Sequence, residues 1–529
     1  MTGHTGQIEQ AFTNWLIESG VEGINGDTQK VEIYQYGEDG RGLRATTDIE
    51  DGDVICSIPL DLVLAHKSDD EEFTTQLGEN LDEFTALAVK LLRERAQQER
   101  SPIHPHIQVL PTSVPSLYGG FPESCREELQ GFVSDPDWEE SRNRTAFEYA
   151  KIAQSPLMTG LTEDDFRWAY SVVSSRAFAG AFEAQDGAKV VWKFCAPLLD
   201  MLDHGGLCQL PGEEPVRRDN VRWGMQDVGS STCRVQAIAT QSVPKGQRLL
   251  LRYIDGFPST HYLLHYGFVP VLDPYVEVDL FPHMFGAVNW TIARLHPEKD
   301  GMGEKERQQL AAEAHKAARE AGLKDIMAAN ESGGVTRDSL RKANPLAVKL
   351  KTGYPNLDHR FVEAISVLSQ PLQGSARDKV KLVDLIVLER IGELLTQPGR
   401  TTLDADLQVL ARHAAPADRN LYAKCLQSYR AKASALRRLQ RPASRFVQDY
   451  ECPISVAEEQ GHLSTCKLQA MQLRADQKMV FLDNLVLATE RTSESSKTPP
   501  KRKARGKAGS DSGAAKGFGA GAVKAKRKQ

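Results

Sequence analysis

The stretch LLLRYIDGFPSTHYLLHYGFV, Leu249–Val269, gives the most specific structural signal in the chain. An apolar run typical of a strand leads into Tyr253, and a turn with Gly256 and Pro258 follows. A second aromatic segment then reaches Tyr266, 13 residues beyond the first tyrosine. Each tyrosine alone is more typical of packing than of chemistry, so the pair gains meaning only from the segments upstream of it.

Two upstream segments place cations next to turns. In DGRGLRATTDI, Asp39–Ile49, two glycines bracket Arg41, and glycine lets the backbone approach a ligand closely. In SSRAF, Ser174–Phe178, Ser175 and Arg176 stand at the end of a predicted helix. Taken singly, these features are ordinarily a turn between strands and a solvated cation.

A third segment, APLLDMLDHGG at Ala196–Gly206, sets two acids and a histidine inside an apolar run. Burying such groups is costly unless they are paired or hydrogen-bonded. Asp200 and His204 would share one face of a helix, which makes a metal site conceivable, but no third ligand follows at a suitable spacing. We therefore favour a buried, hydrogen-bonded structural histidine and expect no metal.

The composition sets the class of protein. The chain has 529 residues, 40% of them hydrophobic and 26% charged, which is typical of a soluble globular protein with several domain-sized units. The longest apolar run, Leu382–Leu388, is too short to span a bilayer, so no membrane partner is expected. The 8 cysteines contain no CxxC pair, which favours a reduced intracellular protein without a zinc ribbon.

The net charge of −6 hides two unlike regions. Thr492–Gln529 holds 11 Lys or Arg and two acids, whereas the rest of the chain holds 54 bases and 69 acids. The overall acidic balance argues against a protein dedicated to coating nucleic acid. The tail is poor in apolar residues and predicts disorder, and its PPKRKARGK stretch, Pro499–Lys507, resembles a nuclear-localisation or nucleic-acid patch. A merely solvated tail is the alternative.

Strand signals come first along the chain and helical signals later. Val31–Ile58 is strand-rich, Leu81–Arg100 has helical periodicity, and Pro102–Pro122 reads as irregular. Thr162 caps a further predicted helix that runs to Phe178. Strands return at Arg234–Ala239, Leu249–Tyr253 and Val276–Val278. Helices are then predicted at Glu304–Leu323, Phe361–Ser369, Val380–Leu395, Asp404–Arg412, Leu421–Leu439 and Leu473–Glu490.

In this order, the segments resemble the SET-domain methyltransferases, in the subclass that includes Rubisco large-subunit methyltransferase. The glycine turn Asp39–Ala45, the helix with Trp168 and SRAF, DMLDH at Asp200–His204, and the spaced tyrosines carry the resemblance. The flanks resemble the same subclass at Ala11–Gly23, Leu110–Glu123, Thr401–Leu410 and Leu473–Leu485.

The resemblance implies an α+β fold with a β-rich SET domain, a helical insertion, an all-α C-terminal domain and a disordered tail. The implied boundaries are 1–30 for a helical lead-in, 31–285 for the SET domain with its insertion at about 67–165, 286–491 for the α-helical substrate-binding domain and 492–529 for the tail.

The resemblance also implies S-adenosylmethionine as methyl donor, without a metal, and a protein nitrogen as acceptor. Tyr253 would be the catalytic tyrosine and Tyr266 a second wall of the acceptor channel. The implied donor-binding residues are Asp39, Arg41, Ser175, Arg176, Asp200, Asp203, His204 and Tyr253. The subclass usually has asparagine where this chain has Asp203, and an ionised carboxylate there would repel the donor's own carboxylate.

The leading hypothesis is a lysine N-methyltransferase that acts on a non-histone protein docked on the helical domain. A histidine methyltransferase, and a SET-like interaction module of weak or no activity, are the alternatives. Nucleic-acid binding or an import receptor would involve the tail alone. We expect residence in the cytoplasm, the nucleus or both; the chloroplast is disfavoured because the resemblance begins near Ala11.

Overall fold

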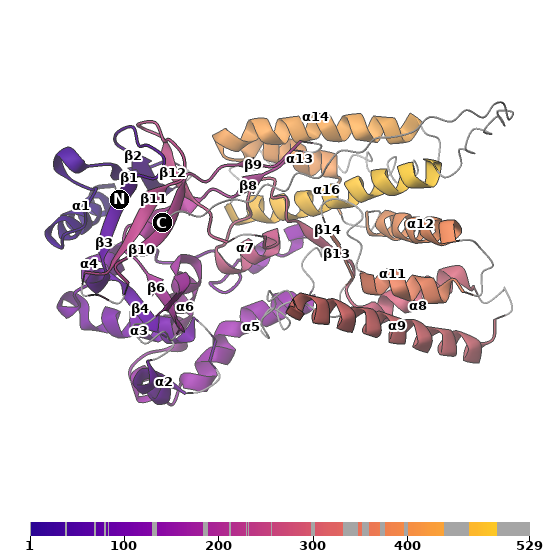
Figure 1. Cartoon of the computed structure of the whole chain (residues 1–529), viewed down its shortest axis with the longest axis horizontal. Helices are drawn as coiled ribbons and strands as arrows, with labels where there is room; N and C mark the ends of the chain where they lie inside the picture. The colour runs from indigo at the N-terminus through magenta and orange to yellow at the C-terminus, as the bar shows by residue number, and fades with distance from the viewer. Residues whose placement is uncertain are drawn as a thin grey trace, which may run out of the picture.

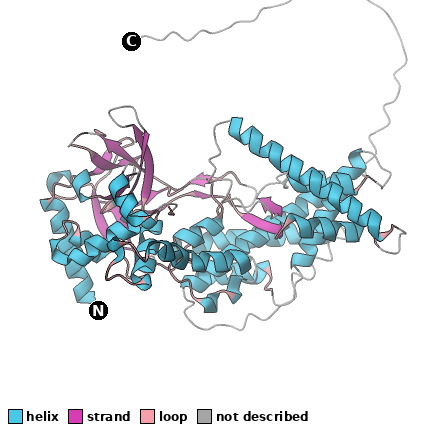
Figure 2. Ribbon diagram, turned by 90° about the horizontal axis from the view of Figure 1, so that it is seen from below, coloured by secondary structure: helices cyan, strands magenta, loops and turns pink. Residues whose placement is uncertain are grey.

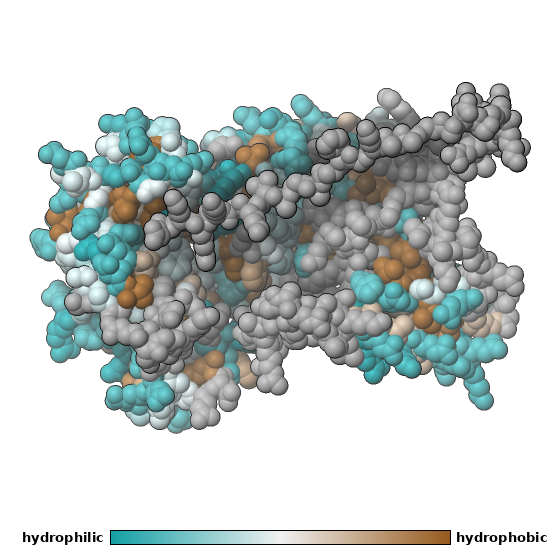
Figure 3. Space-filling model, viewed as in Figure 1, coloured by the Kyte–Doolittle hydropathy of each residue, from teal (hydrophilic) through white to brown (hydrophobic). Residues whose placement is uncertain are grey.

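The computed structural model places a strand-rich end and a helical end side by side (Figure 1). It describes residues 2–37, 40–67, 70–78, 81–82, 84–129, 135–183, 189–210, 213–228, 230, 232–254, 256–297, 302–331, 348–351, 359–370, 376–395, 400–438 and 465–494. The mixture of sheets and helices confirms the predicted α+β class. In the view of Figure 3, hydrophobic residues of the described surface gather in small separate patches.

The largest sheet brings the motif segments into register. Its strands are β1 (Val31–Gln35), β2 (Arg41–Ala45), β12 (Arg248–Leu251), β10 (Val221–Gln226), β11 (Arg234–Ala239) and β3 (Val54–Pro59) in spatial order, with β7 (Asp203–His204) paired to β12. Strand β12 runs antiparallel to β2 and parallel to β7, so Leu251 lies opposite His204. The glycine-turn segment, the DMLDH segment and the strand that leads to Tyr253 are therefore immediate neighbours.

A second sheet and a capped helix position the other motif. Helix α6 (Glu163–Arg176) begins at Thr162, whose hydroxyl accepts from the Asp165 N–H while the Asp165 carboxylate accepts from the Thr162 N–H. The helix ends at Arg176, and the chain enters the sheet formed by β4 (Leu64–Lys67), β6 (Lys189–Cys195) and β5 (Phe178–Glu183). This confirms the predicted cap and places Arg176 at a helix end.

The insertion is largely helical, as expected. Its helices are α2 (Glu71–Leu77), α3 (Thr85–Gln97), α4 (His104–Val109) and α5 (Asp135–Ile152). Helix α4 corrects the interpretation of Pro102–Pro122 as wholly irregular, since Pro105 occupies the first turn of a helix, where its missing N–H is no loss. The N-terminal helix α1 (Thr2–Glu18) packs on α4 and lies within the predicted lead-in, 1–30.

The described part of the C-terminal region consists mainly of helices. They are α8 (Met284–Leu295), α9 (Glu304–Glu331), α11 (His359–Leu368), α12 (Ala376–Leu395), α13 (Leu403–His413), α14 (Pro416–Arg438) and α16 (Thr465–Glu494). One strand was not predicted there: β14 (Val348–Lys351) pairs with β13 (Glu277–Phe281), and the pair lies among the helices in Figure 2.

Helix α16 joins the two ends of the molecule. Near its start, the Gln472 side-chain amide donates to the Val269 carbonyl at 2.8 Å, and the Arg474 guanidinium donates to the Glu128 carbonyl at 2.7 Å. The helix extends to Glu494, past the predicted start of the tail, and residues 495–529 lie outside the described residues. Among the helices that the structure describes, none has the length and hydropathy of a membrane span.

Candidate active site

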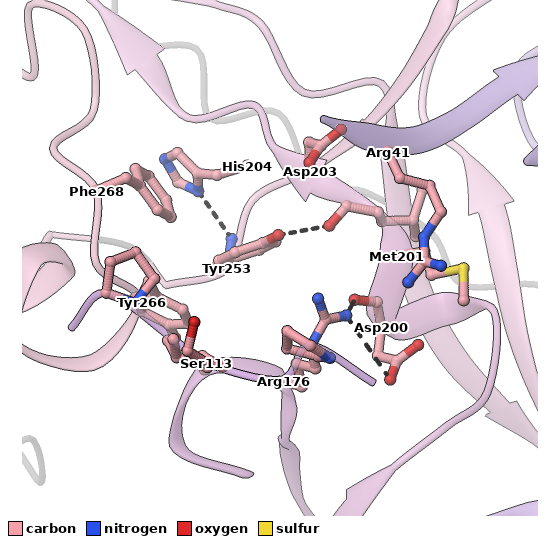
Figure 4. A pocket seen from close by; sticks show the side chains of 15 residues that line it. Arg41, Ser113, Arg176, Asp200, Met201, Asp203, His204, Tyr253, Tyr266 and Phe268 are labelled. Atoms are coloured by element: carbon pink, nitrogen blue, oxygen red, sulfur yellow. Dashed lines mark hydrogen bonds and ion pairs between the residues drawn. The ribbon is translucent and has the colours of Figure 1, made fainter. Parts of the chain in front are cut away.

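A cavity of about 350 Å³ gathers the motif residues where β2, β7, the end of α6 and the loop after β12 meet (Figure 4). Its lining consists of Arg41, Pro111, Ser113, Val114, Pro115, Ser175, Arg176, Asp200, Met201, Leu202, Asp203, His204, Tyr253, Tyr266 and Phe268. All the residues expected at the site therefore line one cavity except Asp39, which lies outside the described residues.

An aromatic wall bounds one side of this cavity. Helix α7 (Ser259–His265) connects the two tyrosines and brings the rings of Tyr253 and Tyr266 to a centroid distance of 5.0 Å. The Tyr253 hydroxyl donates to the Leu202 carbonyl at 2.5 Å. Burial raises the pKa of Tyr266 to about 12 and raises that of Tyr253 further. Both side chains are therefore neutral phenols at physiological pH, and the Tyr253 oxygen keeps its lone pairs for another donor.

His204 is a neutral part of the same wall. Its Nδ1 accepts from the backbone N–H of Tyr253 at 3.3 Å, and its ring lies 5.3 Å from that of Tyr253. Burial lowers the pKa of His204 to about 4. A Cβ at Gly206 would lie 2.3 Å from Nε2, so the glycine leaves room for the ring. The imidazole is thus a structural, hydrogen-bonded group, as the sequence predicted.

Asp200 lies opposite the aromatic wall and is paired with a residue that the sequence did not single out. Leu199–Met201 forms one helical turn before β7, so Asp200 and His204 share no helix face. Instead, Asp200 Oδ2 lies 2.8 Å from His106 Nε2 and 3.9 Å from an Arg176 nitrogen. Burial by itself would raise the pKa of Asp200, but His106 and Arg176 bring it below its usual value.

Two buried polar atoms in this wall lack partners. Asp200 Oδ1 and Arg176 Nε have no hydrogen bond to any described residue, although the Arg176 Nη1 donates to the Asp200 carbonyl at 2.5 Å. Buried polar groups are nearly always satisfied, so such atoms on residues that line a cavity are suited to hold a polar ligand. They fit a ligand that carries both an N–H donor and a carboxylate.

Asp203 has a counter-ion that the sequence analysis missed. Arg248 on β12 donates to Asp203 Oδ2 from Nε at 2.8 Å, and its Nη2 lies 2.7 Å from the same oxygen. A Cβ at Gly42 would lie 2.3 Å from that oxygen, so the glycine admits the carboxylate. The expected repulsion of a donor carboxylate is therefore reduced, because Arg248 balances the charge of Asp203.

The two remaining predicted residues are fixed by neighbours. Arg41 Nη2 donates to the Val109 carbonyl at 2.7 Å, and Nη1 lies 3.4 Å from the Glu9 carboxylate. The Ser175 hydroxyl donates to the Val172 carbonyl of the same helix at 2.9 Å. It can therefore act only as a hydrogen-bond acceptor toward the cavity. Arg41 and Arg176 give this side of the site two cations.

The residues fit S-adenosylmethionine better than they fit a metal. The cavity volume lies in the usual range for small-molecule sites. Arg41, Arg176 and the unpaired Asp200 oxygen suit the amino-acid part of the donor, and the aromatic rings suit its apolar part. In the part of the chain that the structure describes, no group of three His, Cys, Asp or Glu residues is arranged to hold a metal ion.

Solved structures with a similar fold include the SET domain of LSMT bound to lysine and AdoHcy, and Rubisco LSMT bound to AdoMet. Each has a TM-score of 0.52 and 17% sequence identity to this chain, over 92% of this chain and 92% of that one. The chain has the fold of the Rubisco LSMT type of SET-domain protein. This confirms the fold that the motifs predicted.

Curated relatives are similar over shorter stretches. An actin-histidine N-methyltransferase of Canis lupus familiaris is 31% identical over 208 residues, which are 36% of this chain and 33% of the relative. SET domain-containing protein 4 of Artemia parthenogenetica is 29% identical over 185 residues, which are 33% of this chain and 45% of the relative. The chain thus spans a third to under a half of these relatives. No family model matches the chain.

Proposed function

We propose that the protein is an S-adenosylmethionine-dependent protein N-methyltransferase. The observation that carries the proposal is the cavity itself, in which a wall of two neutral tyrosines faces Asp200 and Arg176, each with an unpaired buried polar atom. The fold shared with LSMT and the name of the canine relative support it. Asp39 is kept as a candidate donor-binding residue on its motif match alone.

Different cavity residues would hold different parts of the methyl donor. When bound, S-adenosylmethionine supplies an electrophilic methyl group on a sulfonium. Arg176 would hold the donor's carboxylate through a charge-assisted hydrogen bond, and Asp200 Oδ1 would accept from its ammonium. Ser175 and Asp203 would add acceptors, and Arg41 would add a second cation. His204 would present its backbone to the adenine.

The tyrosine wall would prepare the acceptor amine. A free lysine has a pKa of about 10.4, and moving an ammonium into an apolar channel lowers it. The Tyr253 hydroxyl donates its hydrogen bond to the Leu202 carbonyl, so its oxygen would accept a hydrogen bond from an N–H of the amine and orient the nitrogen lone pair. Tyr266, whose ring contacts that of Tyr253, would form the other side of the channel and exclude water from it. Its ring would pack against the aliphatic part of the acceptor lysine.

We infer lysine as the acceptor because the channel wall is aromatic and offers the amine an oxygen acceptor. A histidine acceptor is the second candidate, and the specific observation that favours it is the similarity to relatives named actin-histidine N-methyltransferase. The helical region, which follows the SET region in sequence and is joined to it by α16, is our proposed docking surface for a non-histone substrate protein.

Labelled S-adenosylmethionine added to a cell extract with the protein tests the proposal directly. We expect one or a few proteins to acquire label, and mass spectrometry of the labelled peptide distinguishes lysine from histidine. A matched reaction with Tyr253→Phe should remove the label. Donor binding without any labelled protein would instead support an interaction module of SET-like fold.

A further inference from the structure

His106 is a buried histidine that packs behind the cavity. It lies on α4, its side chain is 2% exposed, and its Nε2 lies 2.8 Å from Asp200 Oδ2 across 94 residues of sequence. On its other side, the ring stacks on Phe12 of α1 at a centroid distance of 6.1 Å and an angle of 27°. The imidazole is therefore clamped between the N-terminal helix and one acid of the cavity.

The proton in this contact can be placed by chemistry. The pKa of Asp200 lies below its usual value, so its carboxylate is ionised near neutral pH and can only accept hydrogen bonds. His106 must then donate from Nε2 to Oδ2. Arg176 lies near the same oxygen at 3.9 Å. Oδ2 is thus occupied, and Oδ1 is the oxygen left without a partner among the described residues.

A carboxylate with a single fixed oxygen has a defined orientation. The side chain of Asp200 is 1% exposed, so it has little room to rotate, and the bond from His106 selects which oxygen remains available. The N-terminal helix supports this arrangement twice, because Phe12 holds the His106 ring and Glu9 pairs with Arg41 in the same lining.

We propose that His106 is a positioning residue of the donor site, which fixes Asp200 so that Oδ1 stays available to an N–H group of the bound ligand. This inference rests on the proposed function, since the ligand in question is the methyl donor. His106 itself does not line the cavity and acts only through Asp200.

The test compares His106→Ala, His106→Gln and a control. His106→Ala removes the hydrogen bond, and His106→Gln keeps an N–H that can reach Asp200. The matched control is His296→Ala, because His296 is also buried, 5% exposed, and bonded at 2.9 Å to the Leu368 carbonyl in the helical region. Each variant is titrated with S-adenosylhomocysteine by calorimetry, and kcat for labelled transfer is measured at saturating donor.

We expect His106→Ala to weaken S-adenosylhomocysteine binding about tenfold, as loss of a hydrogen bond to a charged group predicts, with kcat within about twofold. His106→Gln should restore affinity to within about threefold of wild type. His296→Ala should lower the melting temperature and leave the affinity unchanged. Unchanged affinity in His106→Ala, or equal weakening in both alanine variants, would overturn the positioning role.

The same titration separates this inference from the proposed function. If wild-type protein binds S-adenosylhomocysteine but labels no protein, the methyltransferase proposal fails, and the affinities still decide the role of His106. If the wild type binds no S-adenosylhomocysteine, both proposals fail.

Discussion

Two buried aspartates, Asp200 at the cavity and Asp406 in the helical region, have similar burial but different surroundings. Each side chain is 1% exposed. Asp406 Oδ1 accepts from Arg474 at 2.7 Å and from the Thr401 hydroxyl at 2.7 Å, and its Oδ2 accepts from Lys478 at 2.6 Å. Asp200, by contrast, keeps one oxygen without a partner among the residues that the structure describes.

The difference separates a group that stabilises the fold from a group prepared for a ligand. Arg474 also reaches Glu128 in the insertion, so the Asp406 cluster ties α13 and α16 to the SET region and leaves no atom of the carboxylate available. Burial lowers the pKa of Lys478 to about 8 even though Asp406 lies beside it. Without the Asp406 carboxylate, the charged form of this buried lysine would be still less favourable. The Asp200 wall keeps one acceptor and one donor atom that a ligand can use.

The largest effect that we expect is on stability. Asp406→Asn removes the carboxylate charge that Arg474 and Lys478 share, and Arg474 then keeps its ion pair with Glu128; the change should lower the free energy of unfolding by about 3–5 kcal/mol. Urea unfolding followed by circular dichroism measures this loss. The affinity of the folded fraction for S-adenosylhomocysteine should not change; a parallel loss of affinity would show that the two regions are not separate in function.

A substitution in the tyrosine wall should reduce catalysis strongly and stability only slightly. Tyr253→Phe keeps the ring in place but removes the hydroxyl that bonds to Leu202. We expect kcat to fall about 100-fold, because a misplaced acceptor nitrogen is penalised strongly, and unfolding to change by about 1 kcal/mol or less. Initial rates at saturating donor give the first quantity. Wild-type turnover by Tyr253→Phe would remove this residue from catalysis.

Asp200→Asn tests the second of the two compared aspartates, the one at the cavity. The amide can still accept from His106, but it loses the charge that would meet the donor's ammonium. We expect the dissociation constant for S-adenosylhomocysteine to rise about tenfold, with a stability loss well below that of Asp406→Asn. Calorimetry and urea unfolding on the same preparation provide both numbers. A stability loss as large as that of Asp406→Asn would mean that Asp200 is chiefly structural.

The smallest effect should come from the basic tail. Deleting residues 495–529, beyond the end of α16, removes all 11 basic residues of the tail and should leave methyl transfer within about twofold of wild type. Salt-sensitive binding to nucleic acid, measured by fluorescence anisotropy, should disappear if the tail provides it. Loss of transfer to the natural substrate would show that the tail recruits it.

Local chemistry made part of this structure predictable from sequence. The Thr162 cap, the helices from Glu304 onward and the strand before Tyr253 depend on residues within one or two turns of each other, and the structure has them. The motif residues also meet in one cavity because they occupy the ends of paired strands and of α6.

What could not be predicted depends on partners far apart in the chain. His106 gives no local signal, and its role emerges only when α4 packs beside Asp200. Arg248 balances Asp203 because β12 pairs with β7, a register that no short-range pattern reveals. Strand β14 is four residues long and is ordered by pairing with β13 rather than by its own propensity. The predicted domain boundaries remain predictions.

Titration of the wild-type protein with S-adenosylhomocysteine by calorimetry tests the central claim most directly, because the claim is that this cavity is a methyl-donor site. We predict one molecule bound per chain, with weaker binding in Asp200→Asn and unchanged binding in the folded fraction of Asp406→Asn. The absence of binding by folded wild-type protein, or equal affinity in wild type and Asp200→Asn, would contradict the account.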